Sequence, residues 1–274
     1  MIRTTLTPSL TEGSVVEGEA GNYRLEIPAG AAGHYRLAQV DDYHNLRRRD
    51  FAWQPPLRMS LRARASHAAI PGTWGFGLWN DPFSMSLLGG QGARRLPVLP
   101  QCAWFFYAGA PNWLSLREDR PGDGLLAATF SAAETQSSRS ADRITMLAAL
   151  PLLALLPAGG PRLHAARRRL RQAVRRVVAQ DAAQVSRDPT AWHNYQIDWQ
   201  VESVAFTVDG ECVLDTPLAP TGFLGCVIWV DNQYLAFSPP AVQGHTTGGG
   251  IRYGMLASTE PAWIEVEGVE IQAG

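Results

Sequence analysis

Short segments with alternating apolar and polar residues constrain this chain more than any other feature. In residues 57–65 every second side chain is apolar, and Arg or Ser stands between them. Residues 193–199 and 203–208 repeat the pattern, and Asp209-Gly210 joins the second of these to 211–214. Successive strand residues point to opposite faces, so such segments are half-buried strands. Asp-Gly between two of them predicts a tight hairpin, because both turn positions need positive φ.

Further strands are predicted at 222–230, 234–237 and 263–271, with 26 Gly and 19 Pro punctuating the chain. We therefore predict an all-β fold, a sandwich of two antiparallel sheets, in one domain spanning residues 1–274. The formal charge of −1 provides no global field to gather nucleic acid, so we expect no nucleic-acid partner. The cations are all Arg, which excludes Schiff-base and phosphate-loop lysine chemistry.

One segment breaks the alternation. Between residues 141 and 186, apolar residues recur at helical spacing, seven Arg fall between 162 and 176, and 146–156 is apolar almost throughout. We interpret it as an inserted α-helical hairpin. It would pack on the outside of the sandwich, cover a cleft, or use residues 161–182 to contact a membrane or a partner protein.

Three motifs, taken in order, resemble those of family 16 glycoside hydrolases. The first is the basic alternating strand from Leu57 that leads to Gly72-Thr-Trp-Gly-Phe-Gly-Leu-Trp79; the second is Trp192-His-Asn-Tyr-Gln-Ile-Asp-Trp199 with the Val208-Asp-Gly210 hairpin. The third is the closing strand Trp263–Ile271. Together they cover about half of the chain. The resemblance implies a concanavalin A-like jelly roll whose ligands lie on the concave face of a curved sheet.

The catalytic motif of that family is missing. Its members carry Glu-x-Asp-x-x-Glu on the strand that follows the Trp-rich one, which places two carboxyl groups about 5 to 5.5 Å apart for retaining hydrolysis. Residues 102–112 read Cys-Ala-Trp-Phe-Phe-Tyr-Ala-Gly-Ala-Pro-Asn and contain no carboxylate. We therefore expect no hydrolysis by the family route. Glu265, Glu267 and Glu270 imitate the spacing on the last strand, where we expect only a solvated outer face.

Aromatic and Asp/Asn residues at strand positions make the candidate ligand site. Aromatic faces stack on apolar rings, and Asp or Asn fixes hydroxyl groups, so we predict binding of a carbohydrate or another partly apolar small molecule. We expect the side chains of Trp79, Trp104 and Trp229 to be exposed in one groove; the alternative is that the aromatics fill the sandwich core. The candidate binding residues are Trp79, Asn80, Asp81, Trp104, Phe106, Trp113, Trp229, Asp231, Asn232 and Tyr234.

Two other function classes stay open. An enzyme of unrelated chemistry would use Asp81, Asp231 or His44 as acid or base, and an interaction protein would dock through the Arg-rich helix. The group Asp41-Asp42-Tyr43-His44 is interpreted as an exposed loop rather than a metal or catalytic site. No motif indicates a cofactor or a metal. The absence of an apolar leader or a long apolar span predicts a cytoplasmic protein.

Overall fold

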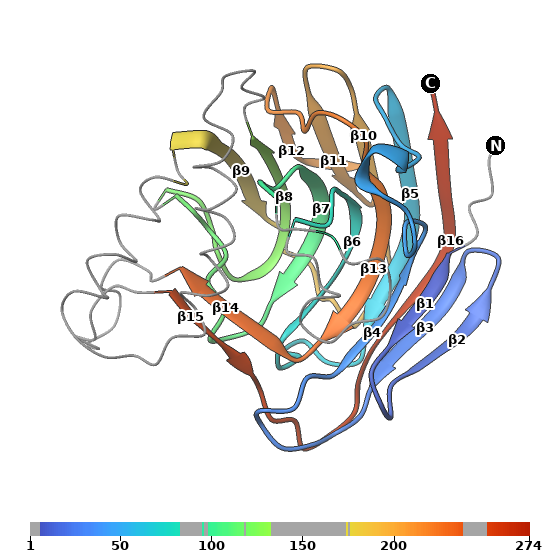
Figure 1. The fold of residues 1–274 in the computed structure, drawn as a ribbon, viewed down its shortest axis with the longest axis vertical. Coiled ribbons are helices and arrows are strands. Elements are labelled where there is room, and N and C mark those ends of the chain that lie inside the picture. The colour runs from blue at the N-terminus through green and yellow to red at the C-terminus, as the bar shows by residue number, and fades with distance from the viewer. Residues whose placement is uncertain are drawn as a thin grey trace.

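The computed structural model is almost entirely β (Figure 1). It describes residues 6–82, 95, 98–117, 119–132, 174, 176–237 and 251–274. Two seven-stranded antiparallel sheets pack face to face, and a two-stranded ribbon flanks one of them. This confirms the predicted all-β jelly-roll sandwich of two antiparallel sheets.

Sheet 1 contains, in spatial order, β1 (Thr7–Leu10), β4 (Leu37–Asp41), β13 (Gly225–Asp231), β6 (Thr73–Trp79), β7 (Cys102–Ala108), β8 (Gly124–Ala132) and β9 (Val178–Gln184). Sheet 2 contains β12 (Glu211–Thr216), β11 (Val204–Val208), β10 (His193–Trp199), β5 (Leu57–Ala65), β16 (Ala262–Ala273), β3 (Asn22–Ile27) and β2 (Val15–Glu19). The ribbon pairs β14 (Gln233–Phe237) with β15 (Ile251–Met255), and a 3-10 turn, η1, spans Arg48–Asp50.

The main core lies between the two sheets. Strand β5 buries every second residue from Leu57 to Ala65, as its alternation predicts. Strand β10 does the same with Tyr195, Ile197 and Trp199, which meet residues from sheet 1 such as Phe105. Each large side chain buried this way contributes about 1.5–3 kcal/mol to stability.

The Asp209-Gly210 hairpin forms between β11 and β12, as predicted. The φ angles are 50° at Asp209 and 83° at Gly210, the left-handed values that such a turn requires. The Asp209 carboxylate also accepts a hydrogen bond of 2.8 Å from the backbone N–H of Asn194 on the neighbouring strand β10. The turn is therefore tied to the sheet that it extends.

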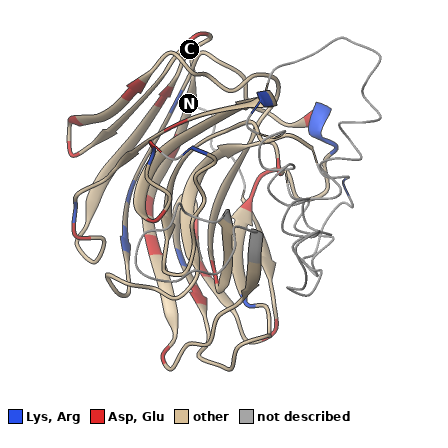
Figure 2. Ribbon diagram, turned by 90° about the vertical axis from the view of Figure 1, so that its left-hand side faces the viewer, with Lys and Arg blue, Asp and Glu red and all other residues tan. Residues whose placement is uncertain are grey.

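The outer face of sheet 2 is polar and charge-paired. Glu265 accepts hydrogen bonds from Arg24 at 2.8 Å and from Arg64 at 2.7 Å, and both guanidinium groups lie over the Trp263 ring. Glu267 pairs with Arg62 at 3.6 Å. Figure 2 shows acidic and basic residues interspersed over the described chain. The Glu residues of β16 therefore belong to a solvated face, as predicted.

The predicted helical insertion is wrong at its C-terminal end. Residues 178–184 form β9, which pairs with β8 along its whole length. Val178, Gln180 and Ala182 are buried at every second position, a period-two pattern that the helical interpretation of Ala182 overlooked, whereas Val174, Arg176 and Val177 are helical as predicted. Most of the rest of the insertion, residues 141–173, lies outside the described residues. No described helix has the length and apolar character needed to cross a membrane.

Sheet 1 is buried on both faces at its centre. All seven residues of β13, of β6 and of β7 are buried. In each strand one alternate set faces sheet 2, and the other set faces away from it, on the concave side of the bowed sheet (Figure 1). This concave face carries a second apolar cluster, separate from the main core.

Candidate binding face on the concave side of sheet 1

Three tryptophans from three adjacent strands meet on the concave face. The rings of Trp79 and Trp229 are stacked with their centroids 6.1 Å apart and an interplanar angle of 4°. The Trp104 ring lies 5.8 Å from Trp79 and 5.6 Å from Trp229, and Phe106 stacks on Trp104 at 5.5 Å. Four of the ten predicted binding residues thus form one group, which we call the aromatic cluster (Trp79, Trp104, Phe106, Trp229).

Two glycines of β6 make room for these rings. A Cβ atom at Gly75 would lie 2.7 Å from Cη2 of Trp229, and one at Gly77 would lie 2.6 Å from Cβ of Trp104. Any side chain at either position would overlap its neighbour. In the Gly-Phe-Gly run of β6, Phe76 therefore fills the core between the sheets. The two glycines leave space on the concave face for the indole rings of Trp229 and Trp104.

The prediction that the three tryptophans are exposed in a groove is wrong. Trp79, Trp104 and Trp229 are only 5%, 8% and 7% exposed, because they pack on one another and on the apolar residues around them. The N–H groups of Trp79 and Trp229 donate to Tyr43 Oη at 2.6 Å and to Thr73 Oγ1 at 3.0 Å. The Trp104 N–H is buried and has no hydrogen-bond partner among the described residues.

The concave positions of β7 are where the resemblance would place catalytic carboxylates. They hold Cys102, Trp104, Phe106 and Ala108. Two acids lie at described concave positions elsewhere in sheet 1, Asp41 on β4 and Asp231 on β13. Asp41 pairs in register with Val227, four residues from Asp231, so their backbone positions are offset by about 13 Å along the strands at 3.3 Å per residue. Retaining hydrolysis needs about 5–5.5 Å and inverting hydrolysis about 6.5–9.5 Å, so this pair fits neither geometry.

Asp231 marks one end of the aromatic cluster. Its Oδ1 accepts hydrogen bonds from Thr73 Oγ1 at 2.7 Å and from the Gln233 N–H at 3.2 Å. Thr73 in turn accepts from the Trp229 indole. Burial raises the pKa of Asp231 to about 7, because the interior disfavours the charged form. This carboxyl group can therefore accept or donate a proton near neutral pH.

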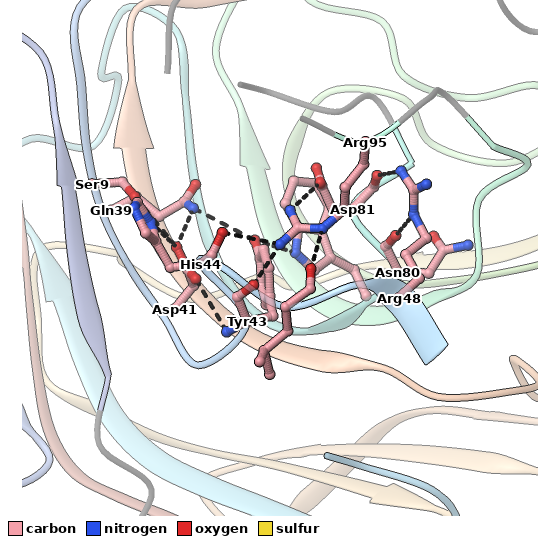
Figure 3. Close-up of polar contacts among 11 residues, drawn as sticks. Ser9, Gln39, Asp41, Tyr43, His44, Arg48, Asn80, Asp81 and Arg95 are labelled. Carbon is pink, nitrogen blue, oxygen red and sulfur yellow. Dashed lines mark hydrogen bonds and ion pairs between the residues drawn. The ribbon is translucent and has the colours of Figure 1, made fainter. Parts of the chain in front are cut away.

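A polar network marks the other end (Figure 3). Asp41 Oδ2 accepts from Gln39 Nε2 at 2.8 Å and lies 3.9 Å from His44 Nδ1, while Ser9 Oγ is 2.8 Å from the same His44 nitrogen. Burial raises the pKa of Asp41. Because Ser9 and Asp41 share one imidazole nitrogen, the geometry differs from a catalytic triad, in which they take opposite nitrogens.

The expectation of an exposed loop at residues 41–44 is wrong. Asp41 and Tyr43 are buried, and Asp42 accepts hydrogen bonds from Trp53 Nε1 at 2.5 Å and from the Cys226 N–H at 2.8 Å. Burial raises the pKa of Asp42 to about 6. This group fastens the end of β4 to its surroundings, and sequence spacing gave no signal of those partners.

Arg95 holds the segment after β4 against the end of β6 (Figure 3). It donates to Asp81 Oδ2 at 2.8 Å and to the carbonyl oxygens of Tyr43, His44 and Leu46. Asn80 donates to the Leu99 carbonyl at 2.9 Å. The structure thus places the predicted site residues Asn80 and Asp81 in the scaffold beside the aromatic cluster.

The remaining predicted site residues divide between scaffold and ribbon. Asn232 uses its whole amide on the backbone: Oδ1 accepts from the Arg36 N–H at 2.8 Å, and Nδ2 donates to the His34 and Leu256 carbonyls. Tyr234 lies against Gly254 on β15, and it alternates with Leu235, a ribbon residue that packs on the second apolar cluster of the concave face. Trp113 bridges to Ala236 beside the ribbon.

No family model matches the chain, and no curated protein matches it in sequence. Solved structures of similar fold include three glucanase-related proteins. A family 16 endo-glucanase from Bacteroides ovatus is 10% identical, with 94% of this chain and 85% of that chain covered and a TM-score of 0.45. The laminarinase catalytic domain from Thermotoga maritima is 10% identical, with 96% and 81% covered and a TM-score of 0.44. Rv0315, a pseudo beta-1,3-glucanase of Mycobacterium tuberculosis, is 13% identical, with 91% and 75% covered and a TM-score of 0.39.

Proposed function

We propose that this protein binds a carbohydrate or a similar partly apolar small molecule on the concave face of sheet 1, without hydrolysing it. The observation that carries the proposal is the Trp104 indole. Its N–H is buried within stacked aromatic rings and has no acceptor among the described residues. A sugar ring offers both an apolar face for such rings and oxygen atoms for such a donor.

The composition of the face supports binding without cleavage. Aromatic rings occupy its middle, while polar groups stand at its two ends, at Asp41 and Asp231. Stacking and hydrogen bonding need only these groups, whereas hydrolysis needs two carboxyl groups much closer together. We therefore expect no release of reducing ends from any β-glucan.

The low exposure of the rings has a kinetic consequence. A ligand that stacks on Trp79 or Trp229 must displace the atoms that now cover them, so association requires a conformational change and will be slower than binding to a preformed site. Stopped-flow tryptophan fluorescence with glucan tetrasaccharides measures this rate. A rate that saturates with ligand concentration is the expected result.

The test compares two buried tryptophans on opposite faces of sheet 1. Trp104→Phe removes the unpartnered N–H from the concave face, and Trp74→Phe removes another unpartnered indole N–H from the core side. Calorimetric titration with β-1,3- and β-1,4-linked glucan tetrasaccharides should show that W104F binds about tenfold more weakly, a loss of about 1.4 kcal/mol. W74F should bind like the wild type.

Two results would overturn the proposal. One is the absence of binding by the wild-type protein to every glycan tested. The other is an equal loss of affinity in W104F and W74F, which would show that general destabilisation explains the effect. Both variants replace a buried Trp by Phe, so their melting temperatures measure how much stability each change costs. Comparing these with the affinities distinguishes a lost ligand contact from general destabilisation.

A further inference from the structure

Buried polar atoms without partners gather around Asp231. Among the described residues, seven buried side-chain nitrogen or oxygen atoms have no hydrogen-bond partner, and three of them are Tyr35 Oη, Gln233 Nε2 and Tyr253 Oη. Native proteins leave few such atoms, and each costs about 1–3 kcal/mol when nothing satisfies it. Three in one neighbourhood therefore need an explanation.

Hydrogen bonds and strand register bring these residues together. Asn232 N–H donates to the Arg36 carbonyl, so the segment before β4 lies beside the end of β13. Gln233 follows directly, and its N–H donates to Asp231. Tyr253 stands on β15 opposite Leu235, and both tyrosines lie close enough to Asp231 for its charge to raise the pKa of their hydroxyls.

The chemistry of the group is that of several neutral donors beside one acceptor. Burial, with the charge of Asp231 adding to it, raises the pKa of Tyr253 to about 12 and raises the pKa of Tyr35 well above its ordinary value, so both hydroxyls stay protonated. Gln233 Nε2 is a donor only. Asp231 supplies an acceptor, and no described cation pairs with it. Arg36, the neighbour of Tyr35, donates to the Gly30, Ala31 and Leu256 carbonyls, and its buried Nε has no partner among the described residues. An anionic ligand would meet the Asp231 carboxylate, whereas the hydroxyl groups of a sugar can both accept from the donors and donate to Asp231.

We propose that Tyr35, Gln233, Tyr253 and Asp231 form a subsite that recognises adjacent hydroxyl groups of a neutral sugar ring at one end of the aromatic cluster. This inference rests on the proposed function and adds the ligand class and the groups that orient it. Stacking on Trp229 supplies contact area, and the subsite sets which ring edge faces Asp231. Uronic acids and sulfated sugars, which carry negative charge, should bind more weakly than neutral sugars.

The experiment removes one hydroxyl at a time. Tyr35→Phe and Tyr253→Phe keep the rings and delete only the unpartnered oxygen atoms, while Tyr107→Phe makes the same change on the core side of β7. In calorimetry with a β-1,3-linked glucan tetrasaccharide, Y35F and Y253F should each bind five- to tenfold more weakly, and Y107F should bind like the wild type. The melting temperatures of Y35F and Y253F without ligand should equal or exceed that of the wild type, because no hydrogen bond is lost.

Each outcome decides one point. Wild-type binding with undiminished affinity in Y35F and Y253F overturns the subsite and leaves the proposed function standing. A lowered melting temperature in these variants shows that the hydroxyls already have partners in the protein and also overturns it. No binding by the wild type overturns both proposals. A crystal structure with bound tetrasaccharide, in which only ordered water contacts Tyr35, Gln233 and Tyr253, would likewise reject the subsite.

Discussion

At the scale of single residues, buried carboxyl groups are the most consequential feature. Burial raises the pKa of Asp231 to about 7 and that of Asp42 to about 6, both above the ordinary value of 3.8. The folded state therefore holds protons at pH values where the unfolded chain has released them. Stability falls as the pH rises from about 4 through these values, because ionisation then favours the unfolded chain.

Replacing Asp231 tests this directly. Asp231→Asn keeps an oxygen for Thr73 and Gln233 but removes the ionisation, so its free energy of unfolding should fall less than that of the wild type between pH 5 and pH 8. The difference should exceed about 1 kcal/mol, since one pKa unit corresponds to 1.36 kcal/mol. Urea denaturation at both pH values measures it. Asp215→Asn removes the same charge from an exposed position and serves as the control; parallel curves for D231N and wild type would contradict the prediction.

At the scale of elements, β6 shows how a strand serves two apolar layers. Its core face carries Trp74, Phe76 and Leu78, while its concave face alternates Thr73, Gly75 and Gly77 with nothing larger until Trp79. The two glycines are empty positions that Trp229 and Trp104 fill from the neighbouring strands. Side chains from the two adjacent strands therefore cover the concave face of β6 at its glycines.

We expect Gly75→Ala to destabilise the protein by about 1–3 kcal/mol, because its Cβ would overlap Trp229 Cη2 and the Phe105 carbonyl oxygen. Trp229→Phe lacks Cη2, so the double variant should lose less stability than the two single changes together. A coupling of at least about 0.5 kcal/mol in chemical denaturation is the expected size. Strict additivity would mean that the ring and the glycine do not constrain each other.

Sequence alternation predicted strands well where one face is buried and the other is polar. β5, β10 and the β11–β12 hairpin coincide with the predicted segments because apolar periodicity and Asp-Gly turn chemistry are local signals. β9 was missed because its concave face carries Gln180 among small residues, so its apolar pattern is weak. The Asp231 subsite could not be predicted either, since Tyr35 and Tyr253 are far apart in sequence and come together only through backbone hydrogen bonds such as that from the Gly33 N–H to the Met255 carbonyl.

At the scale of the whole molecule, the exposed acids and the buried acids have pKa values shifted in opposite directions. Exposed acids are held by arginines: a hydrogen bond from Arg117 lowers the pKa of Asp119 to about 2, and hydrogen bonds from Arg64 and Arg24 outweigh partial burial to lower that of Glu265. A lowered pKa contributes stability that is lost as the pH falls through it. The buried acids lose stability in the opposite direction, as the pH rises.

The melting temperature should therefore be highest near about pH 4, where the buried acids are still protonated and the exposed ion pairs are formed, and should decline as the pH rises toward neutral. The decrease of the melting temperature on the acid side of the maximum should be small, because exposed ion pairs contribute little stability and are screened by salt. Calorimetric scans from pH 3 to 9 at low and high salt measure both limbs. A maximum above pH 7 would contradict the assignment of Asp42 and Asp231 as acids protonated near neutrality.

The central strands of sheet 1 are covered by apolar side chains on both faces, which should slow the exchange of their backbone amides. Backbone amides exchange with solvent deuterium only when their hydrogen bonds open, and those of β13, β6 and β7 have apolar layers above and below them. These three strands should retain their protons longest and report global unfolding. A sugar bound at the Asp231 subsite should slow amide exchange in β4 and β15, the strands that border the subsite.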